Sequence, residues 1–596
     1  MNDPTAPALV SPADEHTRAE WEKIAAAVLR KSGKLQDGDP DSLVWELLTV
    51  RSAGIDIPPL GTPELVADLP ATGVPGAAPY TRGRTAERPE HGWDIRPVFT
   101  VTDPKLTNEA ILVDLENGAT SLWLDLSAAE PGDLASVLDG VLLDLAPVTL
   151  DAPDPIAAAE AFVAVLKERG LAPAEGTNLG ADPIGTAVRA RTTPELTGLP
   201  RIVELAREAG ILGLVVDATA VHDLGASDTQ ELAYSLAVGA TYLRELTEAG
   251  LGVDEALGLI EFRYAATDDQ FVTIAKLRAA RLLWNRVAEL SGGTEAARGQ
   301  RQHAVTSRPM MTKYDPWVNM LRTTVASFAA GVGGADAVTV LPFDAALGLP
   351  DAFSRRIARN TSSLLISESH VAKVVDPAGG SYAVEKLTAD LAEAAWASFG
   401  AIDESGGVLA ALADGSLLAG VGEAAAARRT QIARRKQPIT GVTEFPNLTE
   451  TLPQRAPYPD GTPQVARYAA DFEALRDEPA ATPVFLATMG TVAAHTARAT
   501  FASNLFAAGG IAVEAAGATT GVDDVLRQYA GQPVVCLAGP DSAYSEWGGD
   551  LVSALRAAGA TWVILAGKPG DIEVDDSCAI GVDALAFCTR TREKLA

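Results

Sequence analysis

The chain has 596 residues, too many for one hydrophobic core, so we expect two or more domains. Hydrophobic residues make up 47% of the sequence, and 48 basic against 78 acidic residues give a net charge of −30. This charge argues against a nucleic-acid binder, because a phosphate backbone requires a basic face. The three cysteines, Cys536, Cys578 and Cys588, form no CxxC pair, so neither a disulfide framework nor a zinc site is indicated. Such low cysteine usage fits a reducing compartment.

The first residues, Met1 to Pro7, carry neither a basic region nor an apolar region of the kind that signal peptides have. No run of the sequence approaches the roughly 20 apolar residues that a membrane helix requires. We therefore expect a cytoplasmic protein.

Residues 1–79 are predicted to form an arm of helical patches and extended chain broken by prolines. Thr17 to Lys31 has helical periodicity. The face that this period predicts holds Trp21, Ile24, Ala25 and Val28. Such a segment buries little by itself, so we expect it to wrap another subunit with Trp21 and Trp45 as anchors. Packing of the arm within its own chain is the alternative.

Residues 80–427 alternate short apolar runs with longer helical patterns, which predicts a (β/α)₈ barrel. The helices are expected at Asp228 to Ala249, with Gly250 ending the helix, and at Gln270 to Leu290. The readable strands are Ser121 to Leu126, Val148 to Asp151, Leu212 to Asp217, Ala304 to Ser307, Val338 to Leu341 and Leu364 to Ser367.

Residues 428–481 are predicted to be a proline-containing linker whose basic residues form a solvated helix face. These basic residues are Arg428, Arg429, Arg434, Arg435 and Lys436. Residues 482–596 are predicted to form a flavodoxin-like, doubly wound domain. Its strands are expected at Pro483 to Thr488, Ile511 to Ala515, Val534 to Ala538, Trp562 to Ala566 and Ala584 to Phe587.

Several local strings resemble the adenosylcobalamin-dependent acyl-CoA mutases, methylmalonyl-CoA mutase in particular. They are Tyr80-Thr81-Arg82-Gly83, Thr306-Ser307-Arg308-Pro309, Asp315-Pro316 with Asn319 and Arg322-Thr323-Thr324, Phe343 to Pro350, Arg356 to Asn360 and Asp376 to Tyr382. The likeness runs from about Tyr80 to the C-terminus. It implies a mutase barrel followed by a cobalamin-binding-like domain, in which Arg/Asp pairs such as Arg356 and Asp376 are structural.

The cobalamin site of that family departs from its pattern here. After Thr482 to Gly490 the family continues with Asp-x-His-x-x-Gly, whose three positions are Val492, Ala494 and Ala497 in this chain. His495 lies one residue past the ligand position, and metal geometry tolerates little error, so we expect no rescue by it. The family's Ser-x-Leu reads Val535-Cys536-Leu537, and its glycine pair reads Ala566-Gly567 followed by Lys568, which we expect to obstruct the corrin tail.

The substrate residues of the family are also missing. The family's substrate histidine falls at Ala220 within Ala218 to Gly225, and His222 is interpreted as satisfied by backbone or by Asp223. The family's Thr-Gln-Ser-Leu-His-Thr-Asn reads Ala335 to Leu341, so its Gln, His and Asn are lost. The radical-gating tyrosine falls near Arg88, and the carboxylate-binding arginine has only Arg189 and Arg191 as candidates.

These losses predict a chain with no catalytic, cofactor-binding or metal-binding residues. The resemblance then implies the small subunit of a heterodimeric methylmalonyl-CoA mutase, with adenosylcobalamin in the large subunit and with a reactivating GTPase as a further partner. One alternative is a self-sufficient mutase for another acyl-CoA with a rearranged site. Another is a binding or chaperone module.

Overall fold

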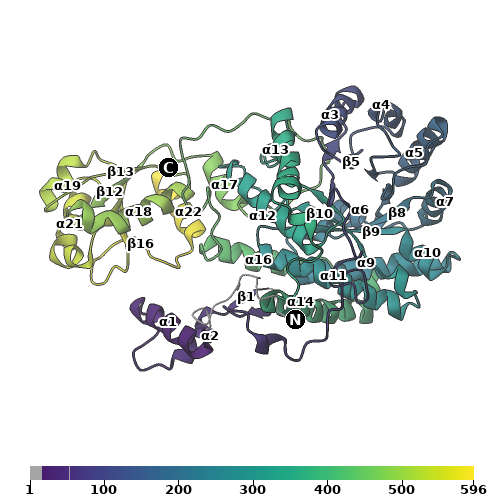
Figure 1. The fold of residues 1–596 in the computed structure, drawn as a ribbon. Coiled ribbons are helices and arrows are strands. Elements are labelled where there is room, and N and C mark those ends of the chain that lie inside the picture. Colours follow the sequence, from purple (N-terminus) through teal and green to yellow (C-terminus); the bar gives the residue numbers. More distant parts are fainter. Residues whose placement is uncertain (1–15, 53) are drawn as a thin grey trace.

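The computed structural model of the chain describes residues 16–52 and 54–596. Two α/β units lie side by side, and a small helical unit near the N-terminus lies below them (Figure 1). Both larger units contain parallel sheets, which confirms the predicted barrel and doubly wound domain. The predictions made on Met1 to Pro7 lie outside the described residues.

The larger sheet closes into a barrel. Nine strand segments lie in the order β3-β11-β10-β9-β8-β7-β6-β5-β4. Segments β3 and β4 are separated only by Arg96 and Pro97; β3 pairs with β11 and β4 pairs with β5, so together they act as one staggered strand that completes the circle. The bounds are β3 Asp94–Ile95, β4 Val98–Thr100, β5 Leu122–Asp125, β6 Val148–Asp151, β7 Asn178–Ala181, β8 Leu212–Asp217, β9 Ile260–Ala266, β10 Arg301–Thr306 and β11 Ala337–Thr339.

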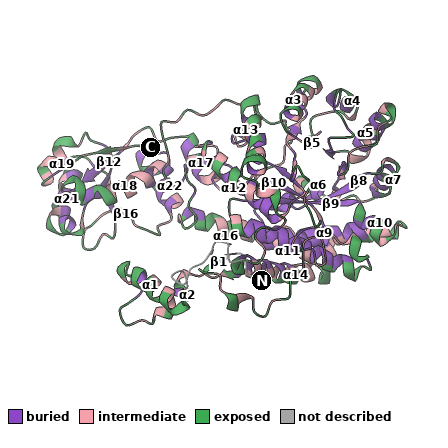
Figure 2. Cartoon of the chain, in the orientation of Figure 1, coloured by how far each residue is buried: buried purple, intermediate pink, exposed green. Residues whose placement is uncertain are grey.

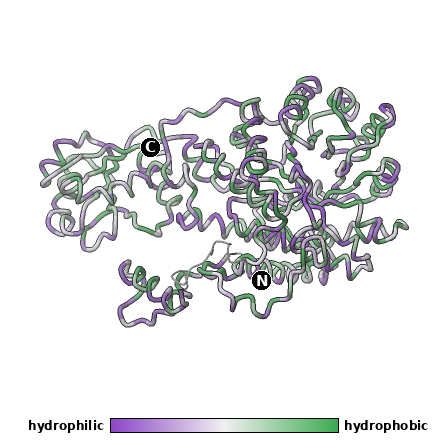
Figure 3. Tube along the Cα trace, viewed as in Figure 1, coloured by the Kyte–Doolittle hydropathy of each residue, from purple (hydrophilic) through white to green (hydrophobic). Residues whose placement is uncertain are grey.

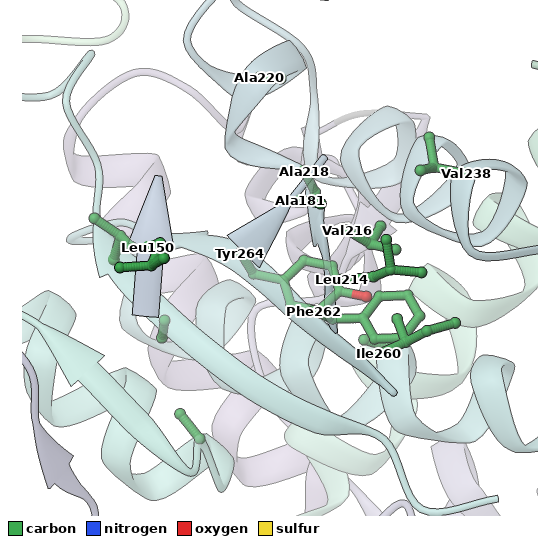
Figure 4. Packing of buried hydrophobic residues seen from close by; sticks show 14 of the residues in the cluster. Leu150, Ala181, Leu214, Val216, Ala218, Ala220, Val238, Ile260, Phe262 and Tyr264 are labelled. Atoms are coloured by element: carbon green, nitrogen blue, oxygen red, sulfur yellow. The ribbon is translucent and has the colours of Figure 1, made fainter. Parts of the chain in front are cut away.

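Helices surround this barrel and bury the outward faces of its strands. Figure 2 shows α9 and α11 buried over most of their lengths, and Figure 4 shows Leu214, Val216 and Phe262 close to the helix that carries Val238. The bounds are α3 Pro104–Glu116, α4 Leu134–Val137, α5 Pro155–Arg169, α6 Pro183–Ala190, α7 Leu199–Ala209, α8 Thr219–His222, α9 Asp228–Glu248, α10 Val253–Gly258, α11 Gln270–Leu290, α12 Val318–Gly333, α13 Ala352–Ser363, α14 Tyr382–Glu404, α15 Gly407–Ala413 and α16 Ser416–Ala433.

One predicted barrel strand is wrong, and four of the nine strand segments had no counterpart in the sequence analysis. Leu364 to Ser367 continues α13 as a wider helical turn, Leu364–Glu368, and Leu365 packs into the core from it. The unpredicted strands are β3/β4, β7 and β9. Strand β9 carries Glu261 and Arg263 in alternation with apolar residues, a pattern that a half-exposed strand also shows, yet all seven of its residues are buried.

The linker is more ordered than predicted. α16 runs to Ala433 and α17 covers Ala470–Asp477, and both contact the C-terminal helix α22. Of the five basic residues there, Arg429, Arg434 and Lys436 are exposed, as predicted, whereas Arg428 and Arg435 are half-buried. Arg428 donates to the carbonyl of Gly225 and lies over Tyr468, whereas Arg429 and Arg435 pair with Asp471 and Glu444. These contacts fasten the linker to both units.

The C-terminal unit has a five-stranded parallel sheet in the order β13-β12-β14-β15-β16, which is the flavodoxin-like order. Figure 3 shows hydrophobic chain inside this unit and hydrophilic chain on its outer helices. Residues Ala584 to Phe587 were predicted as a strand but begin helix α22, and the fifth strand lies earlier. The bounds are β12 Val484–Thr488, α18 Val492–Ala508, β13 Val513–Ala515, α19 Val522–Gln528, β14 Val534–Ala538, α20 Asp541–Ala543, α21 Gly549–Ala557, β15 Trp562–Ala566, β16 Asp576–Cys578 and α22 Ala584–Leu595.

The N-terminal arm has a small core of its own. Helices α1 Arg18–Lys31 and α2 Val44–Leu48 pack around Ala26, Leu29, Leu35 and Val44. The ring centroids of Trp21 and Trp45 are 4.8 Å apart, so the two tryptophans pack on each other within the arm. Of the predicted apolar face of α1, Trp21 and Ala25 pack against this core, whereas Ile24 and Val28 are exposed. A hairpin, β1 Val50–Ser52 with β2 Ile55–Ile57, joins the arm to α14.

Among the described residues no single helix is long and apolar enough to cross a bilayer. The bent pair α15 and α16 reaches the required length and hydropathy only when its two helices are taken together.

Candidate functional site

The carboxyl edge of the C-terminal sheet is where the resemblance places the family's cobalt ligand. Helix α18 begins at Val492, directly after the cap residue Thr491, so the position of the lost ligand, Ala494, is already in the first helical turn and is exposed. His495 is buried, and its Nδ1 lies 3.3 Å from the carbonyl oxygen of Gly490. The imidazole is thus turned back against the chain that precedes the helix, where it is held by backbone.

The inner face of the same sheet is filled by side chains. Cys536 and Cys578 belong to one apolar cluster with Phe506 and Phe587, whose ring centroids are 5.6 Å apart. Burial raises the pKa of Cys588, in the same cluster, to about 12, so it is a thiol at neutral pH and no metal donor. Lys568, expected to obstruct the groove, is exposed after β15. Packed apolar side chains close this part of the sheet.

The barrel axis is filled as well, but by charged and polar groups. At the amino end, Glu261 accepts from Arg96 at 3.0 Å and lies 3.4 Å from Arg301. At the carboxyl end, Asp217 accepts from Arg263 at 2.8 Å and from Arg189 at 2.5 Å. Since Arg96, Glu261, Arg263 and Asp217 are all buried, the axis of the barrel is occupied by paired ions.

Aromatic and polar side chains fill the layer between these two groups of ions. The guanidinium of Arg263 lies 3.9 Å from the ring centroid of Trp123 and donates to Nδ1 of His303 at 3.2 Å. The other ring nitrogen of His303 must then carry the proton, which it donates to Thr339 at 2.7 Å. Burial, together with Arg96 and Arg263, holds the pKa of His303 well below its ordinary value. The imidazole is therefore neutral and fully hydrogen-bonded.

The candidate substrate residues are engaged with partners of their own. Arg189, the first candidate for binding a substrate carboxylate, is held by Asp217 and by the hydroxyl of Thr219. Arg191 is exposed at the end of α6. Ala220 is fully buried on α8. A protein carboxylate thus already neutralises Arg189.

His222 is satisfied, as predicted, but by other groups than those expected. Its Nε2 lies 2.7 Å from the Ser307 hydroxyl, and its Nδ1 lies 3.4 Å from Glu231. Asp223 pairs with Arg308 instead. Glu231 is itself neutralised by Lys276 at 2.7 Å. No local sequence signal marks Glu231 and Lys276, because they lie on separate helices that only the barrel brings together.

The two remaining positions compared with the family, Leu341 and Arg88, also form hydrogen bonds with other parts of the chain. Leu341 is buried after β11, and its backbone N–H donates to the Thr306 hydroxyl at 2.8 Å. Arg88 donates to the carbonyl of Gly331 near the end of α12. Because barrel helices run opposite to the strands, Arg88 lies at the amino end of the barrel, away from its mouth.

A segment of the linker is hydrogen-bonded to the carboxyl rim of the barrel. Ala456 pairs with Leu349, and the hydroxyl of Tyr458 donates to the carbonyl of Ala345 at 3.1 Å. Further on, Ala466 donates to the carbonyl of Asp223 at 2.7 Å and Tyr468 to that of Pro309 at 2.8 Å. The mouth is therefore tied to the linker at the loops that follow β8, β10 and β11.

The described residues contain no cluster of three or more histidine, cysteine or carboxylate side chains suited to a metal ion.

The family model described as methylmalonyl-CoA mutase matches residues 126–532. The chain belongs to the methylmalonyl-CoA mutase family. Two small subunits of methylmalonyl-CoA mutase are similar over nearly their whole lengths. The one from Streptomyces virginiae is 48% identical, with 97% of each chain covered. The one from Propionibacterium freudenreichii subsp. shermanii is 39% identical, with 95% of this chain and 91% of the relative covered.

This family membership explains why the motifs quoted from the sequence remain. Arg82 of the first string pairs with Asp376 of the last at 2.9 Å, and Arg278 lies 3.2 Å from the same carboxylate. Arg356 takes no part in this pairing, contrary to the expectation, and lies over the ring of Phe353. The retained motifs thus hold distant parts of the barrel together, as the pairs of Asp376 with Arg82 and Arg278 show.

Proposed function

We propose that this chain is the non-catalytic small subunit of a heterodimeric methylmalonyl-CoA mutase. Adenosylcobalamin and the interconversion of methylmalonyl-CoA with succinyl-CoA would belong to the large subunit. The observation that carries the proposal is the start of α18 at Val492, which places exposed alanine where the family has its cobalt-binding histidine. The two relatives named small subunit support it.

The residues present do not fit a corrinoid. Cobalt needs an imidazole at a fixed place with an oriented second ring nitrogen, and the one nearby imidazole, His495, is buried against the Gly490 carbonyl. The apolar cluster around Phe506 fills the sheet face that a nucleotide tail would require. We derive no catalytic step through cobalamin in this chain.

An acyl-CoA fits the barrel no better. The ion pairs of Glu261 and Asp217 fill the axis, and the linker at Ala456 to Tyr468 is bonded to the rim loops. Removing such pairs to admit a ligand would leave buried charges without partners, which costs several kcal/mol. We infer that the barrel serves as a scaffold.

The proposal includes the division of the chain into an arm at 1–79, a barrel at 80–427, a linker at 428–481 and a cobalamin-domain-like unit at 482–596. The exposed Ile24 and Val28 on α1 support a role of the arm in contacting the large subunit. A cytoplasmic location and docking of a reactivating GTPase stay predictions of the sequence.

The test uses the full chain, purified alone and together with the large subunit from the same organism. We expect the chain alone to take up no corrinoid, measured by the absorption spectrum after gel filtration, and to show no mutase turnover. The two chains together should form a one-to-one complex with activity. Turnover of an acyl-CoA by the isolated chain would establish a self-sufficient mutase instead. Absence of any complex would favour a separate binding or chaperone module.

A further inference from the structure

An exposed aromatic patch lies at the start of two neighbouring barrel helices. It consists of Trp317 and Leu321 at the start of α12 and of Phe353 and Arg356 at the start of α13. The exposed fractions are 49% for Trp317, 68% for Leu321 and 44% for Phe353. Helices α12 and α13 pack against each other, and α13 shows exposed residues along its length (Figures 1 and 2). We call these four residues the α12–α13 patch.

The rings of the patch are held in place by a buried ring beneath them. Trp317 stacks on Phe343 with centroids 4.7 Å apart and planes 23° apart. Phe353 meets the same ring edge to face at 6.1 Å. Phe343 is buried. Because the two exposed rings are already fixed, a partner would bind them with little further loss of side-chain entropy.

The patch also carries an exposed positive charge. The guanidinium of Arg356 lies 5.4 Å from the ring centroid of Phe353, and no carboxylate of the described residues forms an ion pair with it. Its neighbours Arg355 and Arg359 both lie against Asp114. In a chain of net charge −30, an exposed arginine without a carboxylate is available to a partner's carboxylate.

Tryptophan and arginine beside apolar neighbours are the residues that most often carry the binding energy of protein interfaces. We propose that the α12–α13 patch docks the catalytic large subunit, through an apolar surface of that subunit bearing a carboxylate that faces Arg356. This inference rests on the proposed function and specifies its interface. A second copy of this chain is a poor occupant, because patch against patch across a two-fold axis would bring Arg356 close to its own copy.

The test measures the affinity of full-length variants for the large subunit. Trp317→Ala and Arg356→Glu should each weaken binding at least about tenfold, and Leu321→Ala several-fold. Leu145→Ala is the matched control for Leu321→Ala, since Leu145 is 69% exposed but precedes β6 at the amino end of the barrel. Arg244→Glu on α9, also exposed, is the control for the charge reversal. Both controls should bind as the wild type does.

Because Leu321 and Arg356 are surface residues, unchanged thermal unfolding of their variants separates loss of binding from loss of fold. Rescue of Arg356→Glu by a lysine in place of a large-subunit carboxylate would support the assigned contact. Normal binding by all three patch variants would overturn this inference while leaving the proposed function intact. Failure of the wild type to bind the large subunit at all would overturn both. A dimer of this chain alone that the patch variants abolish would assign the patch to self-association and overturn the inference.

Discussion

The barrel axis and the inner face of the C-terminal sheet are both closed, but by opposite chemistry. The barrel is filled by ion pairs centred on Glu261 and Asp217, whereas the C-terminal unit is filled by an apolar cluster around Phe506. Charges can occupy the barrel because strands on several sides bring a counter-charge to each one. Helices α18 and α22 pack against the C-terminal sheet through apolar side chains, and these side chains close that face. The side chains that can fill an interior space thus depend on its walls: charged groups need counter-charges from several sides, and apolar groups need only apolar neighbours.

The largest effect should come from breaking the ions of the barrel. Glu261→Ala leaves the buried Arg96 and the half-buried Arg301 without their shared carboxylate, so we expect it to lower the free energy of unfolding by about 5 kcal/mol. Hydrogen exchange of the barrel strands measures this separately from the C-terminal unit. Glu160→Ala is the control, because its pair with Arg201 is exposed and should cost no more than about 1 kcal/mol. Equal losses of stability for the two variants would refute the claim that the buried ion pairs stabilise the barrel.

Breaking the apolar cluster of the C-terminal unit should cost somewhat less free energy of unfolding. Phe506→Ala removes a fully buried ring that packs against Phe587, and it should lower the free energy of unfolding of the C-terminal unit by about 4 kcal/mol. Exchange at β12 to β15 should rise while exchange in the barrel stays unchanged. A loss spread over both units would mean that the two cores unfold together.

A third prediction concerns pH and a single carboxyl at the barrel mouth. Burial, with the nearby charge of Asp217, raises the pKa of Asp182 from 3.8 to about 6. The folded chain thus binds this proton more tightly than the unfolded chain, so the stability is present below about pH 4 and is lost as the pH rises through 6. Asp182→Asn lacks this dependence. Between pH 3 and pH 7 its stability relative to the wild type should improve by about 3 kcal/mol.

The contrast for this measurement is Asp217→Asn. Burial alone would raise the pKa of Asp217, but Arg189 and Arg263 lower it. Its contribution to stability is therefore present above about pH 4 and is lost at lower pH, which is the opposite dependence. Urea unfolding at a series of pH values measures both variants. Parallel curves for the two variants would contradict the assigned environments.

The smallest expected effect tests whether restoring the ligand residue reopens the C-terminal site. Ala494→His should change stability little, because Ala494 is exposed, and should produce no corrinoid uptake in the absorption spectrum. The large subunit under the same conditions is the positive control. Stoichiometric binding by Ala494→His would show that the apolar cluster yields readily and would weaken the comparison of the two cores.

The sequence by itself determined the order of the units, the missing histidine at Ala494 and the interpretation of His222 as a satisfied residue. These depend on local motifs and on hydrophobic periodicity, which act within a short stretch of chain. It did not reveal β9, because Glu261 and Arg263 look like solvent-facing residues until the closed barrel turns them inward against Arg96 and Asp217.

Only the tertiary structure decided which groups fill the barrel, that the linker at Ala456 pairs with the rim residue Leu349, and that Trp21 and Trp45 pack on each other. Each of these contacts joins residues far apart in the sequence or selects one of several possible partners. The physical reason is that pairing of charges and burial of rings depend on distance in space, which local patterning does not encode.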